Sequence, residues 1–245
     1  MTRVNDTTAV CIHGMWGTSR RYDTWKPVIE EHMPVRTIDL ERSQRSIKYA
    51  DYVRQVEKFI QGINADKIFV IGHSMGGLLA QAVEDSRIVA RGLVSPAPPN
   101  NIFNGFGFLK RVLTEAGLSS LRQIDQIFTR FSRPTNKEAE RIICNKHKDL
   151  GLDFDFNEAQ KLSIRVYLEV AFGIGTKVPK RENVHVVVGS DDLLTEPRDV
   201  KKVAELHDGT FEIIPGQDHI SLTYNKGVAR NLMEKMLSNG NGRLS

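Results

Sequence analysis

A serine framed by glycines is the residue of this chain with the clearest chemical potential. Ser74 stands at the centre of a G-x-S-x-G pattern over residues 72–76, after the apolar run from Lys67 to Ile71 and before helix-forming residues. Glycine on both sides of the serine permits a turn too sharp for larger neighbours, and such a turn lifts the hydroxyl clear of a sheet. The first amides of the following helix would face any negative charge that develops beside the serine. The pattern therefore predicts Ser74 as a nucleophile.

A serine nucleophile needs a base to take its proton and a carboxylate to orient that base. His219 follows the apolar run from Phe211 to Ile214 and a Pro-Gly turn, whereas the other histidines lack such a setting. An imidazole suits the role because its unperturbed pKa lies near neutrality. Asp191 and Asp192 both follow another apolar run, so residue types alone leave two candidates for the acid.

The order serine, aspartate, histidine resembles the α/β-hydrolase superfamily, and specifically a serine esterase or lipase-like member with a helical cap. The resemblance covers nearly the whole chain. A second family marker, H-G-x-x-G, stands at residues 13–17. The family places the acid three residues after a glycine, which selects Asp192 over Asp191, and its chain order assigns the base to His219.

The resemblance also implies an oxyanion hole. Its donors would be the backbone N–H groups of Met15, with Trp16 as the less favoured alternative, and of Met75, the residue after the nucleophile. His13 precedes the serine, against the family order, so we expect it to shape the loop. We expect Asp218 to point to solvent, and Thr195 to cap the helix that follows the acid.

Short apolar runs alternate with amphipathic helical patterns, which predicts an α/β fold with a mostly parallel six-stranded sheet flanked by helices. Continuous apolar runs indicate strands that are buried on both faces. The first run begins at Thr8, so the two leading strands of the family's full sheet are expected to be missing. The expected strands are Thr8–Ile12, Val35–Asp39, Lys67–Ile71, Gly92–Ser95, Val184–Val188 and Phe211–Ile214.

Residues 103–182 interrupt this alternation with helical patterns and no convincing strand. We expect them to form a helical cap, and residues 1–102 and 183–245 to form the core domain. The expected cap helices are Leu109–Ala116, Ser119–Phe131, Asn136–Lys148 and Asn157–Phe172. Most of the eleven phenylalanines fall in this segment, either to dock the cap or to line an acyl pocket: Phe103, Phe106, Phe108, Phe128, Phe131, Phe154, Phe156 and Phe172.

Composition narrows the remaining possibilities. Hydrophobic residues make up 40% and charged residues 26%, as in a soluble globular protein, and no run is long enough to cross a membrane. The net charge of +4 comes without a basic block, so no nucleic-acid partner is expected. Cys11 and Cys144 do not indicate a disulfide framework, no metal-ligand or cofactor motif is present, and the first residues lack a secretory leader, so the cytoplasm is expected.

These observations predict a serine hydrolase that cleaves a small-molecule carboxylic ester or thioester with an apolar acyl group, through an acyl-serine intermediate. Two alternatives remain open. The same triad serves a lyase or C–C bond hydrolase, and some relatives keep a triad and act as ligand receptors.

Overall fold

The fold is known from a computed structural model that describes residues 7–41, 46–100, 102, 131–132, 144–145 and 162–240. Its centre is a six-stranded parallel sheet in the order β2-β1-β3-β4-β7-β8. The strands are β1 (Thr7–Ile12), β2 (Val35–Ile38), β3 (Lys67–His73), β4 (Ile88–Val94), β7 (Val184–Gly189) and β8 (Thr210–Ile214). Each overlaps one strand expected from the sequence, and the α/β fold class is confirmed.

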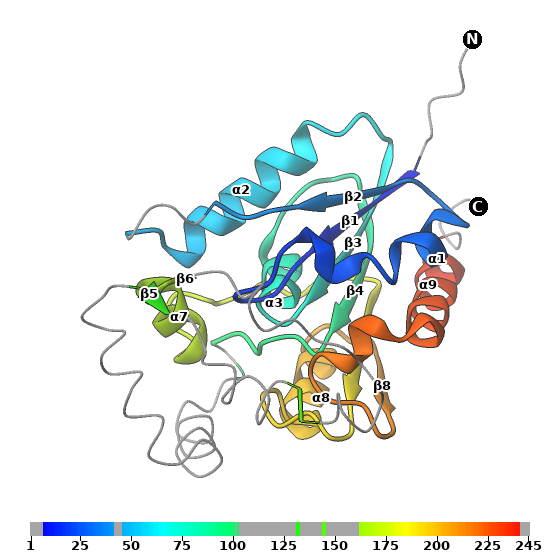
Figure 1. Ribbon diagram of the computed structural model, residues 1–245. Helices are drawn as coiled ribbons and strands as arrows, with labels where there is room; N and C mark the ends of the chain where they lie inside the picture. The colour runs from blue at the N-terminus through cyan, green and yellow to red at the C-terminus, as the bar shows by residue number, and fades with distance from the viewer. Residues whose placement is uncertain are drawn as a thin grey trace.

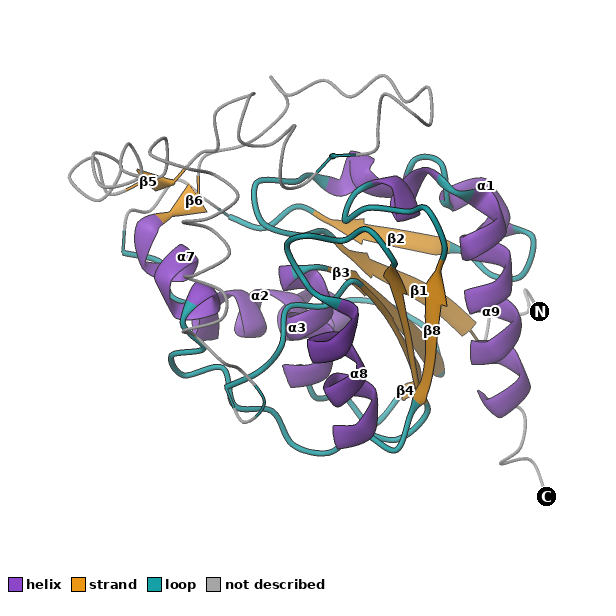
Figure 2. Cartoon of the chain, turned by 90° about the horizontal axis from the view of Figure 1, so that it is seen from below, coloured by secondary structure: helices purple, strands orange, loops and turns teal. Residues whose placement is uncertain are grey.

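Helices cover both faces of the sheet (Figures 1 and 2). One face carries α2 (Tyr49–Gln61), α3 (Met75–Ala82) and α8 (Pro197–Leu206). The other carries η1 (Ser19–Tyr22), α1 (Lys26–Glu30) and α9 (Lys226–Gly240), while η5 (Ser221–Tyr224) joins β8 to α9.

Alternation along each strand divides the core between these two layers. Val10 and Ile12 of β1 belong to the cluster under α2, α3 and α8, whereas Ala9 and Cys11 belong to the cluster under α1 and α9. Successive side chains of a strand point to opposite faces, so a continuous apolar run is what a strand covered on both sides requires.

The strand order changes direction between β1 and β3. The chain passes from β1 to β2 on one side and then crosses to β3 on the other side of β1. In open parallel sheets, the crevice outside the carboxyl ends of two such strands is the usual place for a ligand. The loop after β1 holds residues 13–17, and the turn after β3 holds Ser74.

Within residues 103–182 the described elements are β5 (Phe131–Ser132), β6 (Leu162–Ser163) and α7 (Ile164–Ala171). The expectation of a segment without strands was wrong here, because β5 and β6 pair in antiparallel fashion. This pairing joins residues far apart in sequence, which local periodicity does not reveal. The expected helix from Asn157 corresponds to α7, and the other three expected cap helices lie almost wholly outside the described residues.

Helix α7 of this segment packs beside α2 (Figure 1). Glu169 of α7 accepts a hydrogen bond at 2.6 Å from the backbone N–H of Tyr49, at the start of α2. The hydroxyl of Ser163 donates to the carbonyl oxygen of Ile47 at 3.2 Å. These contacts hold α7 against the core domain near the amino end of α2.

Candidate active site

Ser74 sits in a strained turn between β3 and α3. Its φ of 57° and ψ of −120° are unusual for a non-glycine residue, and strain of this kind tends to occur at functional sites. The Ser74 N–H donates to the carbonyl of Val94 at 3.0 Å, which fixes the turn against β4. A β-carbon on Gly76 would lie 2.1 Å from the carbonyl oxygen of Ile12, so the turn requires glycine there.

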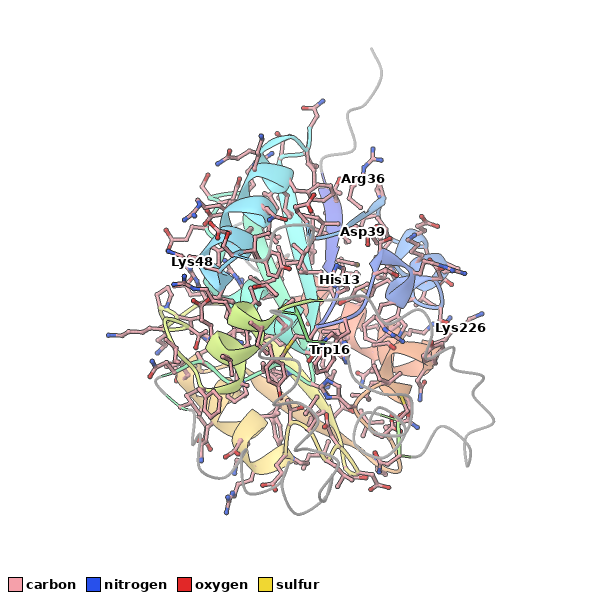
Figure 3. The ribbon with its side chains drawn as sticks, turned by 60° about the vertical axis from the view of Figure 1, so that its left-hand side comes forward. His13, Trp16, Arg36, Asp39, Lys48 and Lys226 are labelled. Carbon is pink, nitrogen blue, oxygen red and sulfur yellow. The ribbon has the colours of Figure 1, made fainter. Side chains whose placement is uncertain are left out.

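His13 organises the loop that follows β1. It is buried, and its Nδ1–H donates to the carbonyl of Gly14 at 2.8 Å. Its Nε2 accepts the backbone N–H of Leu40 at 3.3 Å, next to Asp39 at the end of β2 (Figure 3). Both ring nitrogens are therefore engaged in fixing backbone, which agrees with the loop-shaping role expected from the sequence.

The same loop lies directly over the serine. A β-carbon on Gly14 would come within 2.9 Å of the Ser74 β-carbon. Trp16 adopts a φ of 56°, which is rare for a bulky residue, and its ring meets that of Tyr167 of α7 with centroids 5.9 Å apart. Within the described residues, the backbone N–H groups of Met15 and Met75 have no hydrogen-bond acceptor.

The predicted base and acid form a buried pair. Nδ1 of His219 lies 2.8 Å from Oδ2 of Asp192, and the two residues are 2% and 3% exposed. Because an ionised carboxylate only accepts, the proton between the two residues is on Nδ1. The two residues come from the loops after β8 and β7, which are neighbours in the sheet.

Four hydrogen-bond donors surround the carboxylate of Asp192. Oδ1 accepts the backbone N–H groups of Leu194 at 2.9 Å and Thr195 at 2.8 Å. Oδ2 accepts His219 and the Thr195 hydroxyl, each at 2.8 Å. Burial raises the pKa of Asp192, but the charge of His219 and the hydrogen bonds outweigh it, so this pKa lies below its usual value. The carboxylate therefore stays ionised at neutral pH.

Thr195 is a residue of the site that sequence reasoning placed wrongly. The expectation was a helix cap, yet Glu196 is the N-cap of α8, with Pro197 in its first turn. The Thr195 side chain turns back onto Asp192 instead. A threonine three residues after the acid was the available signal, because that spacing suits a local turn around a carboxylate.

The other two aspartates of these loops have structural contacts. Asp191 accepts a hydrogen bond from the Ser190 hydroxyl at 2.8 Å, and its carboxylate is not the one that meets His219. Asp218 was expected to face solvent, and this was wrong: it is fully buried. Its Oδ1 accepts the backbone N–H groups of Ile220 at 3.0 Å and Ser221 at 2.7 Å, so it fixes the turn that follows the base.

His73, the residue before the serine, supports the base. Its Nε2 lies 2.8 Å from the carbonyl oxygen of His219, and the two ring centroids are 4.8 Å apart. Burial and then the charge of His219 lower the pKa of His73 well below its usual value, so the ring is neutral and donates through Nε2–H. This bond ties the backbone of His219 to the turn that carries Ser74.

The structure brings Ser74, Asp192 and His219 to the carboxyl edge of β3, β7 and β8. Among the described residues the Ser74 hydroxyl has no hydrogen-bond partner. The described residues contain no acidic, histidine or cysteine cluster able to hold a metal ion. No helix in the described ranges is both long and apolar enough to span a bilayer.

Comparison with known proteins identifies the family of the chain. Residues 9–230 match the sequence model of the alpha/beta hydrolase family. No curated protein sequence matches the chain.

Solved structures share the fold at low identity. A carboxylesterase from the ammonia-oxidizing thaumarchaeon Nitrososphaera gargenis is 18% identical, with a TM-score of 0.62, and the match covers 96% of this chain and 91% of that one. Polyneuridine aldehyde esterase is 18% identical, with a TM-score of 0.66 and coverage of 94% and 98%. MenH from S. aureus is 17% identical, with a TM-score of 0.63 and coverage of 98% and 97%.

Proposed function

We propose that this chain, which belongs to the alpha/beta hydrolase family, is a serine hydrolase. It cleaves a carboxylic ester or thioester through an acyl-serine intermediate. One observation carries the proposal. Ser74 is held in a strained strand-to-helix turn, at the same sheet edge as a buried His219–Asp192 pair. An ordinary structural serine has no need of that strain or of that pair.

In the proposed reaction, Nε2 of His219 takes the proton of the Ser74 hydroxyl as Oγ attacks the carbonyl carbon of the substrate. Asp192 holds the imidazole with its proton on Nδ1 and stabilises the imidazolium that forms. The imidazolium then protonates the departing alcohol or thiol. His219 then takes a proton from a water molecule as that water attacks the acyl-serine, and the step releases the carboxylic acid product and restores Ser74.

The negative charge of each tetrahedral intermediate would be stabilised by the N–H groups of Met15 and Met75. The second is the first amide of α3, so the positive end of that helix adds to the stabilisation. Gly14 brings the Met15 loop into contact with the serine, and this contact supports the assignment of the first donor.

For the substrate we propose an apolar acyl group bound beneath a cap formed by residues 103–182. Met15, Trp16 and Tyr167 are partly buried apolar side chains of the loop over Ser74 and of α7, which supports an apolar wall. Of the phenylalanines expected to line the pocket, only the Phe172 side chain is described, and it is 41% exposed. It therefore gives no support to the acyl pocket. Cys11 is a buried free thiol, which suits the reducing cytoplasm as the proposed compartment.

The decisive experiment compares the wild-type protein with Ser74→Ala. We expect a fluorophosphonate probe to label the wild type alone, and hydrolysis of p-nitrophenyl butyrate to fall by about 10⁴-fold to 10⁶-fold in the variant. Unchanged thermal unfolding would show that the variant folds. A variant that keeps a tenth of the activity would disprove the nucleophile.

A series of p-nitrophenyl esters from acetate to dodecanoate tests the apolar acyl group. Each buried methylene contributes about 0.8 kcal/mol, so kcat/KM should rise a few-fold per added methylene until the pocket is full. A steady decline from acetate onward would refute an apolar pocket. Persistent labelling with a single slow turnover would instead favour a ligand receptor.

A further inference from the structure

Thr195 supplies two of the four hydrogen bonds that hold the Asp192 carboxylate, one from its backbone and one from its side chain. It is 6% exposed, so water does not readily replace either bond. We propose that Thr195 is a positioning residue for the triad. Its hydroxyl fixes the rotation of the Asp192 carboxylate and weakens the electrostatic interaction of that carboxylate with the imidazole. This inference rests on the proposed function.

The hydroxyl and the imidazole converge on the same oxygen. Oδ2 of Asp192 lies 2.8 Å from Thr195 Oγ1 and 2.8 Å from His219 Nδ1, while Oγ1 and Nδ1 are 3.4 Å apart. Each of these two groups carries one proton, and both protons are directed at Oδ2. The carboxylate oxygen that orients the base is thereby shared between two donors.

One other acceptor lies near the hydroxyl. The carbonyl oxygen of Ser95 is 3.4 Å from Thr195 Oγ1, against 2.8 Å for Oδ2 of Asp192. A short bond to a charged acceptor is stronger than a long one to a neutral carbonyl, so the hydroxyl proton belongs to Asp192. The side chain is consequently a donor to the acid.

Two consequences follow for the reaction. The N–H groups of Leu194 and Thr195 bind Oδ1, so without the hydroxyl the imidazole is the donor left on Oδ2 and the carboxylate–imidazole pair is aligned less tightly. A hydrogen bond to a carboxylate also reduces its effective negative charge. Without that bond Asp192 stabilises the imidazolium more strongly, so the base stays protonated to higher pH.

The test is Thr195→Val, which keeps the shape of the side chain and removes the hydroxyl. We expect kcat/KM for p-nitrophenyl butyrate to fall about 10-fold, mainly in kcat. The acidic limb of kcat/KM against pH should move to higher pH, and the downfield proton signal of His219 Nδ1–H should shift. Thr195→Ser keeps the hydroxyl and should restore all three. Thr195→Ala removes it without adding a methyl group, and should repeat the shift of the limb if the valine variant folds poorly.

The matched control is Thr223→Val, which removes a buried hydroxyl that donates to the Ile220 carbonyl at 2.7 Å. It should lower stability without moving the acidic limb. A wild-type pH profile in both Thr195→Val and Thr195→Ala would overturn the inference. Failure of the proposed function looks different, because the wild type would then show no labelling that depends on Ser74.

Discussion

Gly14 packs so closely on Ser74 that a β-carbon added to the glycine would lie 2.9 Å from the serine β-carbon. Real β-carbons do not approach each other so closely, and both residues lie on backbone that has little freedom to move. The loop after β1 and the turn after β3 therefore form one packed unit at the strand-order switch. The geometry between the serine and the N–H of Met15 depends on this contact.

We predict that Gly14→Ala lowers kcat about 10-fold to 100-fold, because even a displacement of about 1 Å at a reacting centre can cost that much. The matched control is Gly17→Ala in the same loop, where the nearest atom would lie 3.4 Å away. That variant should stay within about 3-fold of the wild type. Neither glycine has a positive φ, so backbone strain does not confound the comparison. Equal losses in the two variants would show that the contact with Ser74 is not what matters.

The two adjacent aspartates give a second prediction. Asp192→Asn should lower kcat/KM by about 10³-fold to 10⁴-fold, since an amide no longer holds the required tautomer of His219. Asp191→Asn changes charge and shape in the same way one residue earlier, and should cost less than about 3-fold. Steady-state kinetics on the two variants, with circular dichroism to verify folding, decide the matter. The reverse ranking would transfer the role of acid to Asp191.

His207 gives a prediction about stability and pH. It is buried behind α3, donates through Nε2 to the Gln81 side chain at 3.1 Å, and accepts the Arg181 N–H at 3.0 Å. Burial, followed by the charges of Arg91, Arg181 and Lys180, lowers the pKa of His207 from 6.5 to about 4. Between these values the unfolded chain binds a proton that the folded chain does not.

The free energy of unfolding should therefore fall as pH drops from about 6.5 to 4, and the contribution of His207 is fully present above 6.5. One proton corresponds to up to about 1.4 kcal/mol per pH unit. Urea denaturation of His207→Gln across this range should show a shallower slope than the wild type. Part of the slope should remain, because burial also lowers the pKa of His73 and His185. An unchanged slope in His207→Gln would contradict the assignment.

The sheet was predictable because its signals are local. Each buried strand is a short apolar run bounded by turn residues, and all six expected strands are present. The sequence also identified residues at this edge, since Ser74 directly follows β3, and Asp192 and His219 lie in the loops that follow β7 and β8. The strands and helices determine where such residues meet, and local hydrophobic periodicity predicts those strands and helices.

The side-chain contacts were harder to predict from the sequence. Whether Asp218 faces water or caps a turn depends on the backbone of Ile220 and Ser221, which no periodicity describes. Thr195 was assigned to the helix that follows instead of to Asp192 for the same reason. A threonine near the start of a helix can cap that helix or donate to a nearby carboxylate. The β5–β6 pair could not be predicted because its members lie about thirty residues apart in the chain.

The proposed triad is divided by the connection between β4 and β7: Ser74 precedes it, and Asp192 and His219 follow it. Strands β4 and β7 join the two halves of the sheet along the register from Arg91–Val184 to Val94–Val187. A chain cut between these strands would yield two fragments, neither of which holds a full set of reacting groups. Hydrolysis by the mixed fragments would then require their assembly, so the enzyme could serve as a split reporter whose signal measures the association of two fused proteins.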